Sequence, residues 1–140
     1  MWVGTRRQFN GLILAGITIM LTRNFSQSEL ECHCGCGLSS MNENFMEKLQ
    51  ELREKCNFPF KVTSGMRCKK WNEKSGGHKN SSHMKGLACD ISADGLRARL
   101  LIQKALEMGF EGVGISQGGS KFVHIDMKPR ENGKAVWTYS

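Results

Sequence analysis

Three side chains in the second half of the chain have the types and the spacing of a metal site. His83 and Asp90 stand seven positions apart, and His124 follows in the segment FVHIDM. Two imidazoles and one carboxylate, with one position left open for water, form the ligand set expected of catalytic rather than structural zinc. Bound zinc lowers the pKa of water from about 15.7 to about 7 and polarises a nearby carbonyl. The three residues therefore predict a zinc site that hydrolyses amides.

Further sequence blocks stand around these residues in a fixed order. They are SGMR at residues 64–67, GGHKNSSH at 76–83, HMKGLACD at 83–90, VHID at 123–126 and the late Trp137. These blocks resemble the motifs S-G-x-R, G-G-x-x-N-S-x-H, H-x-x-G-x-A-x-D and V-H-I-D of peptidase family M15, the zinc D-alanyl-D-alanine carboxypeptidases and related murein peptidases. The resemblance covers about residues 25–140. It implies an α+β domain of the hedgehog/DD-peptidase type, in which a small, mostly antiparallel sheet packs against helices.

The same resemblance implies an activity and roles for individual residues. The protein would be a zinc metallopeptidase that cuts peptidoglycan stem peptides or cross-links, as a D-Ala-D-Ala carboxypeptidase or as a murein endopeptidase of bacterial or phage-lysis type. His83, Asp90 and His124 would bind Zn²⁺. Arg67 would stabilise charge on the substrate or the transition state, a role that suits a guanidinium group; the alternative is a surface arginine that caps a loop. Trp137 is either a core residue or a wall of the substrate cleft.

The sequence defines the general base less well. Several members of the family carry an acidic residue three positions before the last histidine ligand, where this chain has Lys121. The two-residue period of a strand puts Asp126 on the same face as His124, so Asp126 is the first candidate for the base. Its alternative roles are to orient His124 or to bind substrate. His78 is the second candidate, and the alternative for His78 is a solvated loop position.

A different class of function fits the same residues. The hedgehog signalling domain has this fold and a similar zinc triad but acts as a binding protein, and Lys121 here replaces the family's acid. A non-hydrolytic, zinc-stabilised cell-wall-binding module is therefore the alternative to an enzyme. A nucleic-acid partner is not expected, because the sequence has no recognised binding motif and no pattern of aromatic and basic residues for stacking.

The periodicity of apolar residues predicts the elements that carry these side chains. We expect helices at 40–55 and 96–108, strands at 60–64, 87–91, 113–116 and 121–127, and a loop at 69–85. Ser40 and Glu43 predict a capping box for the first helix, whereas Asp94 and Gly109 mark the ends of the second. The side chains expected on the buried faces are Phe45, Met46, Leu49, Leu52 and Cys56 in the first helix and Leu96, Leu100, Leu101, Ala105 and Met108 in the second.

Residues 1–24 differ in composition from the rest of the chain. Arg6 and Arg7 precede an apolar run at 11–21, which is too short to span a bilayer comfortably and has the proportions of an export signal. The arginine pair resembles a twin-arginine signal. We therefore expect export or anchoring, with membrane contact through residues 9–22 and a location in the cell envelope, the periplasm or outside the cell. The alternative is a short buried or interfacial helix, or an upstream extension, in a cytoplasmic or phage-associated protein.

The composition is that of a single basic domain at residues 25–140. The 140-residue chain has 39% hydrophobic residues, 24% charged residues and a formal net charge of +7. Positive charge of this size favours anionic partners such as cell-wall polymers and affects association rather than fold. We expect a monomer that binds a peptidoglycan peptide.

Half of the six cysteines are concentrated in the segment CHCGCG. Cys32, Cys34 and Cys36 alternate there, and Cys56, Cys68 and Cys89 stand singly. We expect structural thiols or disulfides, for example between one of the first three and Cys68. A second metal site is the alternative, although the paired cysteines of zinc fingers are usually separated by two to four residues.

Overall fold

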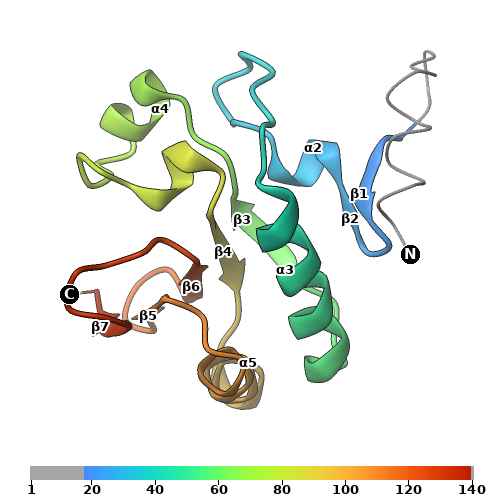
Figure 1. Ribbon diagram of the computed structural model, residues 1–140, viewed down its shortest axis with the longest axis vertical. Coiled ribbons are helices and arrows are strands. Elements are labelled where there is room, and N and C mark those ends of the chain that lie inside the picture. Colours follow the sequence, from blue (N-terminus) through green and yellow to red (C-terminus); the bar gives the residue numbers. More distant parts are fainter. Residues whose placement is uncertain (1–17, 140) are drawn as a thin grey trace.

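A mixed five-stranded sheet carries the residues singled out above. The structure, a computed structural model, describes residues 18–139. The strands are, in spatial order, β3 (Lys61–Ser64), β4 (Ala88–Ser92), β6 (Phe122–Asp126), β5 (Gly112–Ser116) and β7 (Ala135–Thr138). Only β5 and β7 run parallel among these neighbours, so the sheet is mostly antiparallel. The predicted α+β domain is confirmed (Figure 1).

Two helices cover one side of the sheet. They are α3 (Glu43–Cys56) and α5 (Gly95–Glu107), and Figure 1 shows both on the same side. The stripe predicted for α3 is buried, and it joins the inward side chains of the three central strands in one core. Those inward residues are Cys89, Ile91, Val113, Val123 and Ile125. Since strand side chains alternate, their neighbours project from the other face of the sheet.

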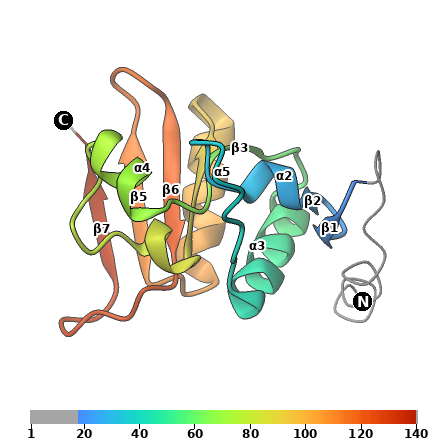
Figure 2. The same ribbon diagram turned by 90° about the horizontal axis from the view of Figure 1, so that it is seen from above.

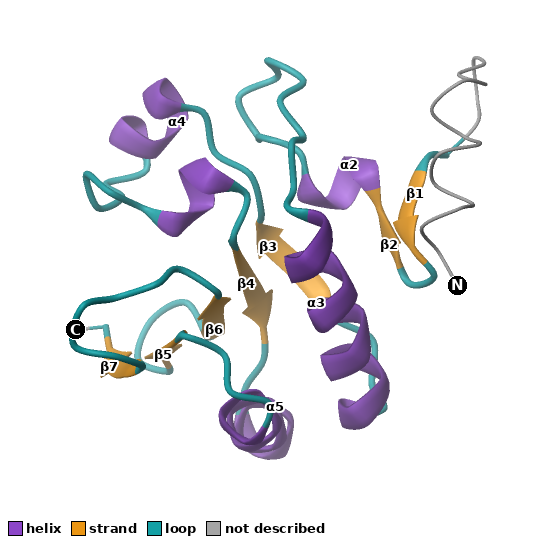
Figure 3. Ribbon diagram, viewed as in Figure 1, coloured by secondary structure: helices purple, strands orange, loops and turns teal. Residues whose placement is uncertain are grey.

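Two short helices lie on that other side, within the segment 69–85 that was predicted to be a loop. They are α4 (Lys69–Lys74) and the 3₁₀ helix η1 (Ser82–Lys85). Figure 3 shows both as helix, so the prediction of a loop is wrong here. Both are too short to show an apolar period, and side-chain caps help to define their starts. Cys68 Sγ accepts the Trp71 N–H, and Ser81 Oγ accepts the His83 N–H.

The folded domain begins before residue 25. Strands β1 (Met20–Thr22) and β2 (Phe25–Ser26) form a hairpin that continues into α2 (Gln27–Leu30), and Figure 2 shows this unit beside α3. Leu21 and Phe25 are part of the core, and Thr22 Oγ1 donates to Gln50 Oε1 of α3 at 2.7 Å. The end of the predicted signal or anchor segment thus belongs to the domain. Residues 1–17 of that segment lie outside the described part.

Within the described residues, no helix has the length and the apolar character needed to cross a bilayer. The predicted membrane contact through residues 9–22 remains a prediction.

Two helix details differ from the prediction. The N-cap of α3 is Asn42, whose side chain accepts the Phe45 N–H at 2.9 Å, and not Ser40. The N–H of Asn42 is itself bonded to the Gly86 carbonyl at 3.0 Å, which fixes the capping residue beside η1. Leu96 is 81% exposed rather than buried. It stands five positions before Leu101, and at roughly 3.6 residues per turn this places it away from the core-facing stripe.

Candidate metal centre and active site

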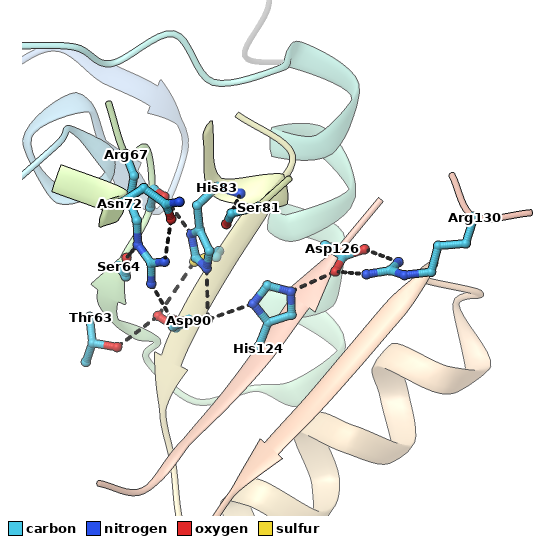
Figure 4. Close-up of polar contacts among 12 residues, drawn as sticks. Thr63, Ser64, Arg67, Asn72, Ser81, His83, Asp90, His124, Asp126 and Arg130 are labelled. Carbon is cyan, nitrogen blue, oxygen red and sulfur yellow. Dashed lines mark hydrogen bonds and ion pairs between the residues drawn. The ribbon is translucent and has the colours of Figure 1, made fainter. Parts of the chain in front are cut away.

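The structure brings His83, Asp90 and His124 together from three different elements. Their donor atoms all lie within 4.8 Å of one another. His83 Nε2 is 3.2 Å and His124 Nδ1 is 2.9 Å from the same oxygen, Asp90 Oδ1. His83 stands on η1, whereas Asp90 and His124 are direct partners in the register of β4 and β6. Figure 4 shows the three side chains pointing toward one another in front of these strands.

The outer nitrogen of each imidazole is held by a hydrogen-bond acceptor. His83 Nδ1 lies 2.7 Å from the Gly65 carbonyl oxygen, and His124 Nε2 lies 2.7 Å from Asp126 Oδ2. Because these oxygens can only accept, each outer nitrogen carries a proton. In a neutral ring the inner nitrogen then presents its lone pair, and the two lone pairs both face the carboxylate of Asp90.

This arrangement is suited to a cation. Two imidazole lone pairs and a carboxylate oxygen, all buried, face one another without a proton between them in the neutral state. Burial alone would raise the pKa of Asp90, but hydrogen bonds and charge from His124 and His83 hold that pKa well below its ordinary value. Burial lowers the pKa of His124, yet Asp126 and Asp90 outweigh it and raise that pKa. The donor set therefore fits a divalent ion that imidazole and carboxylate both bind, such as zinc.

Asp126 lies on the predicted face of β6, but its carboxylate is fully engaged. It is 0% exposed. Arg130 Nη1 and Nη2 donate to its two oxygens at 2.8 and 2.9 Å, and the Lys128 N–H adds a third bond at 3.0 Å. Burial opposes ionisation, but Arg130 and His124 keep the pKa of Asp126 well below its usual range. This geometry favours the orienting role considered for Asp126 over the role of general base.

Two glycines in β5 leave the space that this site needs. A Cβ on Gly112 would lie 2.7 Å from Asp126 Oδ1 and 2.8 Å from Arg130 Nη1. A Cβ on Gly114 would lie 2.7 Å from the indole nitrogen of Trp137. Since Gly114 pairs with His124 on one side and Trp137 on the other, the indole crosses the glycine and reaches the imidazole, with ring centroids 5.3 Å apart.

The side chains of His83, Asp90 and His124 form part of the wall of an open cavity of about 620 Å³. Trp137 lines this cavity and packs on Arg130, so it is a wall of the cleft rather than a core residue. The other side chains that line the cavity are Arg67, Ser75, His78, Asn80, Ser81, Ser82, Phe122, Lys128, Arg130 and Tyr139. Asp90 is the one carboxylate among the lining residues that the structure describes.

Arg67 lies beside Asp90 at the edge of the cavity. Its Nη2 is 3.5 Å from Asp90 Oδ2, the oxygen that is not shared with the histidines. Its Nε donates to Ser64 Oγ at 3.0 Å and its Nη1 donates to Asn72 Oδ1 at 3.2 Å. These contacts hold the guanidinium at the edge of the cavity, so the alternative of a surface arginine that caps a loop is not what the structure shows.

His78 and Lys121 occupy different surroundings. His78 is exposed and lines the cavity, and its Nδ1 accepts the Asn80 N–H at 3.2 Å. Lys121 is also exposed, and its Nζ lies 3.8 Å from Asp94. The structure therefore leaves His78 as a titratable group with access to the cavity, whereas Lys121 lies outside the cavity lining.

Sequence reasoning missed Arg130 and Asn72. Arg130 follows β6 in a loop and belongs to none of the recognised blocks, although its position four residues after Asp126 permits the ion pair. Asn72 stands on α4, which was not predicted, and joins Arg67 to the His78 carbonyl through its amide. Neither residue has a signal in the sequence that would single it out.

The fold and the site together define a small α+β domain in which two histidines and an aspartate, a donor set suited to a cation, lie at an open cavity. The family model described as Peptidase M15 matches residues 23–126. The chain therefore belongs to the peptidase M15 family, whose members are metal-dependent peptidases. A comparison with curated proteins finds none that matches. Arg130, Trp137 and Tyr139, which line the cavity, lie beyond the matched region.

Proposed function

We propose that this protein is a zinc-dependent peptidase that hydrolyses peptide bonds in peptidoglycan stem peptides or cross-links. The observation that carries the proposal is the convergence of two imidazole lone pairs and one carboxylate oxygen at an open cavity. Membership of the M15 family supports metal-dependent peptide hydrolysis. The peptidoglycan substrate is supported by the resemblance of the sequence blocks to murein peptidases, and it makes the cell envelope the site of action.

His83 Nε2, His124 Nδ1 and an oxygen of Asp90 would hold the ion. Zinc bound in this way supplies a Lewis acid and a water of lowered pKa, and three protein ligands leave a position for that water. The outer partners Gly65 and Asp126 keep both rings in the required tautomer and orientation, which is the usual task of such groups.

Arg67 and His78 supply the remaining functions. The Arg67 guanidinium, at the cavity edge, is placed to stabilise negative charge that develops on the scissile carbonyl or is carried by the substrate. His78 is our candidate for proton transfer to the leaving amine, because it is the exposed imidazole of the cavity lining. Asp126 acts through His124 as a positioning residue. This reverses the order in which the sequence ranked His78 and Asp126.

The test is digestion of purified peptidoglycan and of defined stem peptides, followed by mass spectrometry of the products. We expect released fragments that name the bond, loss of release with a chelator, and recovery with added zinc. Lys104→Ala, a change on α5 at a half-buried residue outside the cavity lining, serves as the control and should behave like the wild type. Retention of the protein on peptidoglycan without any cleavage would overturn the proposal and support the non-hydrolytic binding module.

Arg67→Ala tests the charge-stabilising role. Removal of one such donor from an active site typically costs roughly 10²- to 10³-fold in kcat. We expect a loss of this size with zinc content unchanged, measured by steady-state kinetics on the stem peptide identified above. A change in KM alone would show that Arg67 only binds the ground state of the substrate.

A further inference from the structure

A second cluster of ligand side chains lies apart from the cavity described above. The sulfur atoms of Cys32, Cys34, Cys36 and Cys68 all lie within 4.8 Å of one another. Cys34 Sγ is 3.5 Å from Cys32 Sγ and 3.6 Å from Cys68 Sγ. All four are free thiols in this structure. The sulfurs thus form one compact group, in which Cys34 neighbours two others, rather than two separate pairs.

The distances match those of a tetrahedral thiolate site. A zinc–sulfur bond is about 2.3 Å, so two sulfurs on the same tetrahedral ion lie roughly 3.8 Å apart. The distances from Cys34 Sγ to the sulfurs of Cys32 and Cys68 are close to that value. Sets of four thiolates select zinc or iron–sulfur centres, and a site closed by four protein ligands is structural rather than catalytic.

The loop that carries three of the cysteines is shaped to bring alternate side chains together. In an extended strand, the Cα atoms of alternate residues stand roughly 6.6 Å apart, so a turned backbone brings their sulfurs together more readily. Here Gly35 has a φ of +87°, and a Cβ at that position would meet nothing within 4 Å. The glycine is therefore needed for the backbone turn and not for packing. A bond of 2.8 Å from the Cys32 N–H to the Leu38 carbonyl closes the loop.

The fourth cysteine comes from the start of α4, next to the active-site arginine. Figures 1 and 2 show the loop of residues 31–38 beside this helix. The Cys68 N–H points at Cys32 Sγ at 3.4 Å, and the Trp71 N–H points at Cys68 Sγ at the same distance. Backbone N–H groups directed at sulfur stabilise thiolates, and such outer partners are common around metal ligands.

The residues around the cysteine cluster are also suited to a negatively charged metal centre. Four thiolates around a divalent ion carry a net charge of −2. Lys70 and Lys74 line the same surface hollow as Cys34, Cys36 and Cys68, so positive charge lies close to the cluster. By contrast, Cys56 and Cys89 are buried and stand outside the cluster.

We propose that Cys32, Cys34, Cys36 and Cys68 bind one zinc ion in a structural site that is separate from the His83, Asp90 and His124 site. The ion ties residues 31–38 to the start of α4. Because Arg67 immediately precedes Cys68, and its N–H donates to the His83 carbonyl at 3.1 Å, the same tie holds Arg67 beside the cavity. This inference does not depend on the proposed peptidase activity.

The test is the zinc content of variants of the full chain after dialysis, measured by plasma mass spectrometry. We expect two equivalents in the wild type and one in His83→Ala/His124→Ala, because only the cysteine site remains. Cys34→Ser/Cys36→Ser should also lose one equivalent. Cys56→Ser, which lies outside the cluster, is the matched control and should keep both. Two equivalents in the cysteine variant, or none in the histidine variant, would overturn the proposal.

A second measurement avoids any need for the cysteine variant to fold. The His83→Ala/His124→Ala protein is loaded with Co²⁺ in place of zinc, and its absorption spectrum is recorded. An intense thiolate-to-cobalt charge-transfer band in the near ultraviolet is expected. The absence of that band, or a disulfide among these cysteines in the freshly purified protein, contradicts the proposal. Loss of murein hydrolysis changes neither readout, so failure of the two proposals can be told apart.

Discussion

The two clusters of ligand side chains in this protein are built in opposite ways. Asp90 and His124 stand on the paired central strands β4 and β6, and both are buried. Cys34 and Cys36 stand on a loop, and both are exposed. Sheet hydrogen bonds fix the first pair whether or not a metal is bound, whereas the loop must be held by its own contacts. A metal site that a sheet holds in place can leave one coordination position open for substrate. A loop site that is held together by its ion instead uses all four positions for protein ligands.

Removal of the two metal ions should affect activity and stability separately. Loss of the ion from the histidine site should remove activity with little loss of stability, because the strands remain paired. Loss of the ion from the cysteine site should lower stability first, because four ligands join two segments of irregular backbone.

His124→Ala has the largest expected effect. It removes one of the three ligands and leaves Asp126 paired with Arg130. We expect hydrolysis of the stem peptide to fall by several orders of magnitude, to the rate measured with excess chelator, because the Lewis acid is lost. Kinetics and zinc content measured on the same preparation check this, with one equivalent of zinc remaining. Residual activity above the chelated wild type would show that the triad is not the catalytic metal site.

Chelation of the remaining zinc in the His83→Ala/His124→Ala variant tests whether the cysteine site stabilises the fold. An ion that binds only the folded state stabilises it by about 4 kcal/mol when present at 1,000 times its Kd. We therefore expect a strong chelator to lower the free energy of unfolding by about this amount, measured by urea titration. The same variant with Cys34→Ser and Cys36→Ser is the control and should not respond. An unchanged urea midpoint in the parent variant would mean that the cysteine site contributes nothing to folding.

Asp126→Asn distinguishes a positioning residue from a base. Loss of a partner that orients a metal ligand typically costs roughly 10- to 100-fold in metal affinity or activity. We expect weaker zinc binding at the histidine site and substantial recovery of kcat when zinc is saturating. The matched control is Glu107→Gln, an exposed carboxylate on α5. A kcat that stays low at saturating zinc would assign the general-base role to Asp126 instead of His78.

The two clusters also differ in how well their geometry could be predicted from the sequence. His83, Asp90 and His124 could be placed together because they lie in motifs and because strand parity fixes which side chains share a face. The buried stripe of α3 followed from its helical period. For the cysteines the sequence offered a second metal site only as the alternative to structural thiols or disulfides, because the geometry of the cluster depends on the positive φ of Gly35 and on contacts between distant segments. Alternate spacing alone pointed away from a common ion.

The parts of the site that were missed share a physical reason. Arg130 and Asn72 act through side-chain hydrogen bonds made by loop or short-helix residues, and such bonds leave no period in the sequence. Strand β7, which was not predicted, pairs in parallel with β5 at the edge of the sheet. Its burial alternates only between half-buried and exposed residues, so its apolar pattern is weak. The sheet edge that completes the cavity was therefore the least predictable part of the fold.

Gly114→Ala tests whether the edge strand β7, which carries Trp137, contributes to activity, and it has the smallest expected effect. The new methyl group would clash with the Trp137 indole, which crosses Gly114 to contact His124. The indole must therefore move from its place in the cavity wall. We expect about a tenfold loss in kcat/KM, because a displaced wall orients substrate less well, with zinc content unchanged. Gly118→Ala, where an added Cβ meets nothing within 4 Å, is the matched control. Equal activity of the two variants would show that Trp137 does not contact the substrate, and that the sheet-built site needs only its central strands.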